Sequence, residues 1–105
     1  FEGFQKIKHM PYSDDSSFFV FQIFLKDRDK LLMELKKRNI GVSVHYSNPL
    51  TKMTYYKKKY KINNNDYKNA TNYGNTNISL PVYPKLKNKE IDSICKFIKK
   101  FIENE

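Results

Sequence analysis

Residues 40–50, which read IGVSVHYSNPL, hold a group of side chains that can donate or accept hydrogen bonds, and we single out four of them. They are Ser43, His45, Tyr46 and Asn48. Alternation of apolar and polar residues predicts an extended strand, with Ser43 and His45 on its polar face and Tyr46 on its packed face. Pro49 lacks a backbone donor, so Asn48 and Pro49 are expected to end the strand. His45 should therefore lie at a strand end beside a turn, where functional side chains are common.

His45 has two interpretations when the residues are considered alone. The imidazole can contact a ligand, or it can simply bond a neighbouring backbone carbonyl. Without further information we favour the second interpretation.

The length and composition limit the kinds of protein that this chain can be. At 105 residues it is long enough for one domain with a modest core. No stretch approaches about 18 consecutive apolar residues, and there is no signal-peptide pattern, so we expect a soluble, cytoplasmic protein without membrane contacts. The single cysteine, Cys95, cannot form an internal disulfide or a multi-cysteine metal site, which fits a reducing compartment. The sequence starts at Phe1 rather than at an initiator methionine, so we expect an excerpt of a longer protein.

The formal net charge of +9 is compatible with nucleic-acid binding through phosphate contacts. Of the twenty basic residues, however, only Arg28 and Arg38 are arginines that can form a bidentate fork. The lysine run at residues 57–59 is most simply a solvated face. Nucleic acid is therefore not the partner that we expect.

Two stretches of the chain carry strand patterns in addition to residues 40–50. Residues 16–26 are apolar on both faces, which predicts a central strand covered on two sides. Their surplus aromatic surface, which includes Phe18 and Phe24, favours a second domain or a dimer partner, although a long loop would also cover it. Residues 77–84 read as a short strand that two prolines limit.

Two other stretches have helical spacing. Residues 27–38 are expected to form a helix with Asp27 as its N-cap and Asn39 as a left-handed residue after its end. A second amphipathic helix is expected over residues 88–101 or slightly beyond. Cys95 lies on the apolar stripe of that helix, so we expect a buried small hydrophobe rather than a reactive thiol.

The remaining regions carry weaker patterns. Residues 51–77 indicate short helices lined by tyrosines, with Gly74 as an interruption. Residues 1–15 have no clear period and are expected to be an arm or an incoming linker. The element order indicates an α+β fold, a two-layer domain in which about three mainly antiparallel strands carry the helices on one face. The other face would remain for a partner.

Several short blocks follow one another along the chain. They are DRD at 27–29, the helix that leads into IG at 40–41, HY at 45–46, PL at 49–50, Ala70, ISLPVYP at 78–84, and the closing amphipathic helix. This ordered set resembles the C-terminal small domain of the DegT/DnrJ/EryC1/StrS family of sugar aminotransferases. The resemblance implies that residues 16–105 are that small domain, with the fold of small domains in fold-type I enzymes, and that residues 1–15 arrive from a preceding domain.

The resemblance also implies an activity for the parent protein. Such enzymes use pyridoxal 5'-phosphate (PLP) to transfer an amino group from an amino acid, usually glutamate, to a nucleotide-linked ketosugar, for polysaccharide or amino-sugar biosynthesis. They are homodimers, and the large domain carries the Schiff-base lysine and most of the cofactor site, so this chain alone should not transaminate. The same resemblance implies substrate contacts by Ser43, His45, Tyr46 and Asn48, which would orient sugar or phosphate oxygens.

Three positions depart from the pattern of the family. Asn39 stands where glycine is usual, which is tolerated because asparagine also adopts the left-handed conformation. Thr51 replaces a common histidine and Thr71 replaces a frequent acid, which alters the expected substrate contacts. Two alternatives remain, a PLP- or PMP-dependent sugar dehydratase with the same small domain, and a free-standing basic module that binds nucleic acid.

Overall fold

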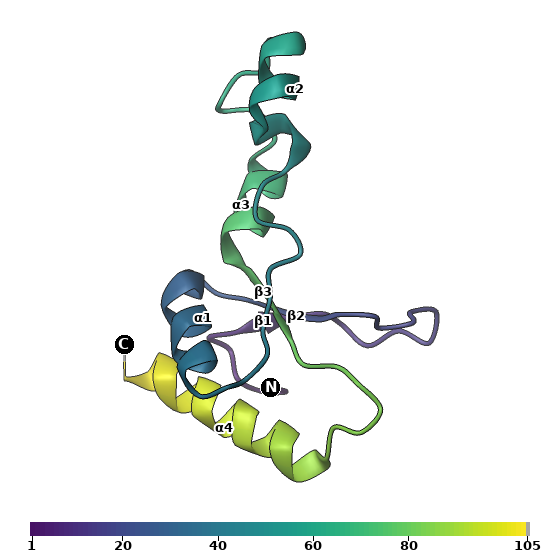
Figure 1. Ribbon diagram of the computed structural model, residues 1–105, viewed down its shortest axis with the longest axis vertical. Helices are drawn as coiled ribbons and strands as arrows, with labels where there is room; N and C mark the ends of the chain where they lie inside the picture. Colours follow the sequence, from purple (N-terminus) through teal and green to yellow (C-terminus); the bar gives the residue numbers. More distant parts are fainter. Residues whose placement is uncertain (105) are drawn as a thin grey trace.

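The computed structural model describes residues 1–104 and contains a small sheet, two helices packed on it and an arm that projects away (Figure 1). Within this range the sheet has three antiparallel strands in the order β1 (Lys8–His9), β2 (Phe21–Phe24) and β3 (Asn77–Leu80). The helices packed on the sheet are α1 (Arg28–Lys37) and α4 (Asn88–Glu103). The arm consists of the 3-10 helix η1 (Leu50–Lys52), α2 (Thr54–Lys59) and α3 (Lys68–Thr76). The expected α+β fold is confirmed. Among residues 1–104, none of the helices combines the length and the apolar composition of a membrane span.

The strand β2 is central, as residues 16–26 predict, although its ladder covers only four residues. Ile23 pairs with Ile78 of β3, and both side chains are fully buried. Because side chains alternate along a strand, Gln22 and Phe24 face away from α1 and α4. Phe18 and Phe24 are only half-buried, so the chain does not fully enclose its second aromatic face.

Residues 40–50 do not form the expected strand. Only Ser43 joins the sheet, through two backbone hydrogen bonds with Ser79 at N–O distances of 3.3 and 2.8 Å. The prediction is wrong because the backbone groups of His45 are bonded by side chains instead of by a neighbouring strand. The third strand of the sheet is β1, which is too short to give a detectable period.

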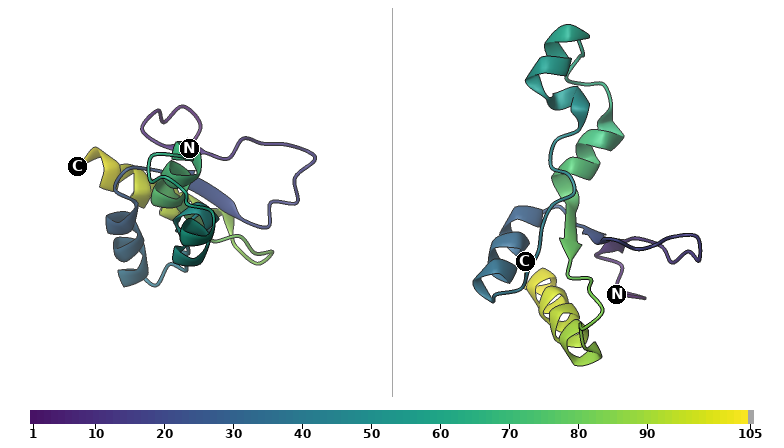
Figure 2. Two further views of the ribbon diagram at one scale, coloured as in Figure 1. Left: turned by 90° about the horizontal axis from the view of Figure 1, so that it is seen from above. Right: turned by 45° about the vertical axis from the view of Figure 1, so that its right-hand side comes forward.

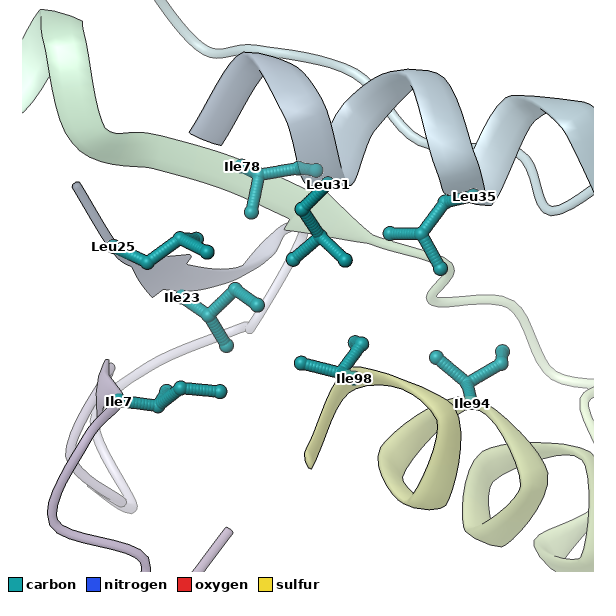
Figure 3. Close-up of a cluster of buried hydrophobic side chains, with 8 residues drawn as sticks. All are labelled: Ile7, Ile23, Leu25, Leu31, Leu35, Ile78, Ile94 and Ile98. Carbon is teal, nitrogen blue, oxygen red and sulfur yellow. The ribbon is translucent and has the colours of Figure 1, made fainter. Parts of the chain in front are cut away.

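The hydrophobic core lies between the sheet and the helices α1 and α4, whose side chains converge in Figure 3. Its buried members are Ile7, Ile23, Leu25, Leu31, Leu35, Ile78, Ile94 and Ile98. Ile7 belongs to residues 1–15, and Phe1 and Phe4 pack against the same core. The first residues of the chain therefore contribute both a strand and core contacts.

The end of α1 follows the predicted pattern. Asn39 has a φ of 56°, and its N–H donates to the Lys36 carbonyl at 3.0 Å. The N–H of Ile40 donates to the Leu35 carbonyl at 3.0 Å, which completes a Schellman motif. At the other end Asp27 occupies the N-cap position but makes no side-chain cap hydrogen bond.

The helix α4 is the longest element, as its apolar stripe predicts. Its N-cap is Lys87, whose backbone N–H donates to the Glu90 carboxylate at 2.8 Å. Cys95 is half-buried rather than enclosed, because it lines an apolar groove beside Ile91. This partial burial raises the pKa of the Cys95 thiol.

The arm stands away from α1 and α4 in Figure 1 and in the right-hand view of Figure 2. Gly74 does not interrupt a helix, as the sequence had indicated, but lies buried inside α3. A Cβ at this position would overlap the carbonyl oxygen of Ser47 and approach Pro49. Glycine therefore allows the two chain segments at the base of the arm to approach closely.

Candidate functional site

The face of the sheet opposite the core carries buried polar side chains. Because Ile23 and Ile78 face the core, Gln22, Asn77 and Ser79 face the other way. Asn77 is 0% exposed, and Gln22 and Ser79 are each 4% exposed. Buried polar groups require hydrogen-bond partners, and these three side chains find partners in the segment that contains His45.

Two carboxamides, those of Gln22 and Asn77, hold the backbone of His45 and Tyr46, and we call this pair the amide clamp. Asn77 Oδ1 accepts the N–H of His45 at 3.1 Å, and Asn77 Nδ2 donates to the Tyr46 carbonyl at 3.3 Å. Gln22 Nε2 donates to the His45 carbonyl at 2.7 Å. The peptide bond between His45 and Tyr46 is cis.

Side chains from α1 and α3 support the amide clamp. The Tyr73 hydroxyl, from α3, donates to Gln22 Oε1. Arg28, at the start of α1, is 7% exposed and donates from Nη1 to the Asn77 carbonyl at 2.8 Å. The same guanidinium pairs through Nε with the Asp29 carboxylate at 2.6 Å. The clamp is therefore attached to the sheet, to α1 and to the arm.

The imidazole of His45 is half-buried and lies beside two hydroxyl groups. Its Nδ1 is 2.8 Å from Ser79 Oγ and 3.4 Å from Ser43 Oγ. The Tyr46 ring meets it edge-on, with centroids 5.3 Å apart and an interplanar angle of 86°. Ser43 and His45 thus belong to one cluster, and the imidazole bonds a hydroxyl instead of the backbone carbonyl of the simpler interpretation.

Tyr46 and Asn48 lie on the arm side of this cluster. Tyr46 is 71% exposed, so its predicted place on a packed strand face is wrong, because the chain turns toward the arm here. Both residues line an open hollow of about 630 Å³ at the base of the arm. The other lining residues are Pro49, Leu50, Met53, Asn69, Ala70 and Tyr73. The four predicted residues therefore fall into two pairs. Ser43 lies beside the His45 imidazole, and Tyr46 and Asn48 line the same hollow. The contact between His45 and Tyr46 connects the two pairs.

The sequence-based reasoning missed four residues of this site, Gln22, Tyr73, Asn77 and Ser79. A signal existed for Gln22, because it is the polar residue inside the apolar run FFVFQIFL, where it needs a partner. Asn77 and Ser79 flank an isoleucine in the predicted strand NISL and carry a weaker form of the same signal. Tyr73 carried none, since it is one of eight tyrosines.

Comparisons with solved structures identify the class of domain. The fold matches part of S. venezuelae DesV, solved in complex with a ketimine intermediate, with a TM-score of 0.82 and 20% identity, over 95% of this chain and 27% of that chain. It also matches Spr1654 of Streptococcus pneumoniae, assigned as a sugar aminotransferase, with a TM-score of 0.78 and 26% identity, over 94% of this chain and 27% of that chain. The chain therefore has the fold of a small α+β domain that forms about a quarter of these larger proteins.

The family follows from the sequence comparisons. A family model described as the DegT/DnrJ/EryC1/StrS aminotransferase family matches residues 1–99, and the chain belongs to this family. It is also 31% identical over 77 residues to the spore coat polysaccharide biosynthesis protein SpsC of Bacillus subtilis, which covers 72% of this chain and 20% of SpsC. The chain spans about one fifth of the length of the curated relatives that it matches.

Relatives solved in PLP and PMP forms imply that PLP is the cofactor of the family. The cluster around His45 does not by itself fit that cofactor. Its hydrogen bonds go to amides, hydroxyls and a guanidinium, and within residues 1–104 none of them joins it to a lysine that could form a Schiff base. The same range holds no group of three or more His, Cys, Asp or Glu arranged for a metal ion. The half-buried imidazole of His45 and the exposed phenol of Tyr46 fit an oxygen-bearing ligand instead.

Proposed function

We propose that this chain is the C-terminal small domain of a cytoplasmic, homodimeric PLP-dependent sugar aminotransferase. The parent enzyme transfers an amino group from an amino acid, glutamate being the donor we favour, to a nucleotide-linked ketosugar. Residues 16–105 form most of the small domain, and residues 1–15, which add β1 and Ile7 to it, arrive from a large domain that binds PLP. Membership of the aminotransferase family and the similarity to a polysaccharide biosynthesis protein support this function.

The observation that carries the proposal is the rigid support of His45 and Tyr46. Buried amides fix the backbone of both residues, whereas the imidazole is half-buried and the phenol is exposed. Side chains with a fixed backbone and accessible polar atoms can bind a substrate with little loss of conformational freedom.

The four predicted contact residues then have distinct roles. Ser43 and His45 hydrogen-bond oxygens of the substrate from the sheet side. Tyr46 and Asn48 contact it from the hollow at the base of the arm, where a phenol and a carboxamide can bond sugar hydroxyls.

The test is an amino-transfer assay with the parent enzyme, glutamate and a nucleotide-linked ketosugar. We expect His45→Ala and Tyr46→Phe to raise KM for the sugar about tenfold, since each removes a hydrogen bond to the substrate. His9→Ala is the matched control, because His9 lies exposed in β1. An unchanged KM in both site variants would refute the substrate contacts, and a deoxygenated product would favour the dehydratase.

A basic nucleic-acid-binding module is the second candidate, supported by the net charge of +9 and by Lys59, whose ammonium lies 5.5 Å from the Tyr55 ring centroid. Fluorescence anisotropy with a generic oligonucleotide tests it. If the chain is an aminotransferase domain, we expect weak or no binding of the oligonucleotide at physiological salt. Tight binding with a steep salt dependence, lost when Lys57, Lys58 and Lys59 are replaced by alanine, would favour the module.

A further inference from the structure

Among the described residues, the hydroxyl of Ser79 makes the shortest side-chain hydrogen bond with the imidazole of His45. Ser79 is 4% exposed, and its Oγ lies 2.8 Å from His45 Nδ1. The backbone N–H and carbonyl of Ser79 are already bonded to Ser43. Within residues 1–104, the partner of the hydroxyl itself is the His45 imidazole.

The amide clamp fixes the backbone of His45 close to this hydroxyl. Asn77 fixes the backbone N–H of His45 and Gln22 fixes its carbonyl, so the Cα position of His45 is set relative to β2 and β3. Ser79 lies two residues after Asn77 on the same face of β3, which brings its hydroxyl to the same side. The contact between Ser79 and His45 thus follows from the sheet itself.

The position of the hydrogen atoms can be deduced from this contact. A hydroxyl has one hydrogen to donate, and a buried one requires an acceptor. Within residues 1–104, the acceptor that lies within hydrogen-bond distance of Ser79 Oγ is His45 Nδ1. Ser43 Oγ is a second, more distant neighbour of His45 Nδ1, at 3.4 Å. Nδ1 can accept only when it carries no hydrogen, so the neutral ring carries its hydrogen on Nε2.

We propose that Ser79 is a positioning residue that holds His45 in the tautomer with hydrogen on Nε2. The ring then presents an N–H donor to a ligand, and Nε2 has no hydrogen-bond partner within the described residues. The matching ligand group is an oxygen acceptor, a phosphate or a sugar oxygen, rather than a group that must lose a proton to His45. The identity of this ligand rests on the proposed function, whereas the tautomer does not.

The chain contains an internal reference for the test, because its second histidine has the opposite environment. His9 Nδ1 lies 2.9 Å from the Met10 carbonyl, which can only accept, so this contact favours hydrogen on Nδ1. Long-range proton–nitrogen NMR spectra of the chain with labelled histidines, in mildly alkaline buffer where a free imidazole is neutral, distinguish the two tautomers. We expect His45 and His9 to show opposite patterns.

Substitutions at Ser79 decide whether the hydroxyl is responsible. Ser79→Ala should convert the His45 signals to a mixture of tautomers, and Ser79→Thr, which keeps a hydroxyl, should restore the Nε2–H pattern. Ser93→Ala, on the exposed side of α4, should leave the spectrum unchanged. A His45 ring with hydrogen on Nδ1 in the unaltered chain, or the same spectrum in Ser79→Ala, would overturn the inference.

Kinetics of the parent enzyme separate this inference from the proposed function. Ser79→Ala should raise KM for the ketosugar several-fold with little change in kcat, and Ser79→Thr should reverse the effect. Weaker inhibition by uridine diphosphate in Ser79→Ala assigns the acceptor to a phosphate, and unchanged inhibition assigns it to the sugar. A parent enzyme without activity on ketosugars would refute the proposed function, while the NMR result would still decide the tautomer.

Discussion

The side chain of Asn77 is fully buried and bonds three backbone groups, the N–H of His45 and the carbonyls of Tyr46 and Tyr73. Asn77→Ala would leave the His45 N–H and the Tyr46 carbonyl without these partners, at about 1–3 kcal/mol for each group that stays buried, whereas the Tyr73 carbonyl keeps the backbone N–H of residue 77. We expect the free energy of unfolding, measured by urea denaturation, to fall by about 3 kcal/mol.

Asn75→Ala is the matched control for this variant. Asn75 is exposed near the end of α3, so its removal should change the free energy of unfolding by less than about 0.5 kcal/mol. Equal losses for the two variants would contradict the role assigned to Asn77.

Gly74 gives a second prediction at the scale of single residues. Alanine normally stabilises a helix interior by about 1 kcal/mol relative to glycine. Here the added Cβ would overlap the Ser47 carbonyl oxygen, so Gly74→Ala should destabilise the protein by about 2 kcal/mol in urea. Asn72→Ala, exposed on the same helix, should be neutral or slightly stabilising. A more stable Gly74→Ala variant would show that the Ser47 segment yields freely.

A third prediction concerns the rate at which the Cys95 thiol is alkylated. Burial raises the pKa of its thiol, and the positive charge of Lys99 opposes this shift only in part. Because the thiolate is the reactive form, alkylation near the ordinary thiol pKa of about 8.5 should be slower than that of an unstructured cysteine peptide. The rate should continue to rise at pH values where the peptide rate is already constant, as mass spectrometry can measure. Identical pH profiles for protein and peptide would contradict this expectation.

The sequence indicated part of the candidate site. The polar segment around His45 was found from its composition and from the family resemblance, and its substrate contacts stay a prediction. Gln22 and Asn77 were not found because their hydrogen bonds reach His45 across 23 and 32 residues. A contact between a side chain and a distant backbone group produces no periodic pattern.

At the scale of elements, the end of α1 depends on one left-handed residue. Asn39 has a φ of 56°, a conformation that costs a residue with a Cβ about 1–2 kcal/mol. Asn39→Gly should therefore increase the free energy of unfolding by about 0.5 kcal/mol, and Asn39→Ala should decrease it by about 1 kcal/mol. Thermal denaturation measures both changes.

Asn75→Gly provides the contrast, because Asn75 lies inside α3. The same exchange should there lower the free energy of unfolding by a few tenths to about 1 kcal/mol. An effect of the same sign at both positions would show that the left-handed backbone at Asn39 is not responsible.

The elements differ in how well the sequence predicts them, and the difference has a physical cause. α1, α4 and β2 each bury a continuous apolar surface against the core, so their period is recorded in the sequence. Residues 40–50 have the alternation of a strand but do not form a strand. After Ser43 the amide clamp, rather than a neighbouring strand, bonds the backbone. β1 forms with two residues because β2 offers a free edge, which no local pattern reveals.

At the scale of the whole molecule, the arm is joined to the core only at its base. No residue of η1 or α2 is buried, so these turns should open without unfolding the sheet. We expect backbone amides of α2 to exchange with deuterium roughly 100-fold faster than those of β2 and β3. Amides around Ile98 of α4, a helix with buried residues, are the control. Equal protection in α2 and α4 would contradict a locally unstable arm.

The two-layer architecture was predictable, whereas the projecting arm was not. Tyr56 and Tyr60 have the i, i+4 spacing of a packed helix face, yet they are 37% and 62% exposed. A tyrosine can serve a core or an open surface, and the sequence of one chain does not record which surfaces another domain covers.

One consequence of the architecture concerns mechanical coupling. α3 ends at Thr76 and β3 begins at Asn77, so no flexible loop separates the arm from the strand (Figure 1). A rotation of α3 would therefore move Asn77 directly, and with it the carboxamide that bonds the His45 N–H and the Tyr46 carbonyl. The orientation of the His45–Tyr46 peptide is thus coupled mechanically to the orientation of α3.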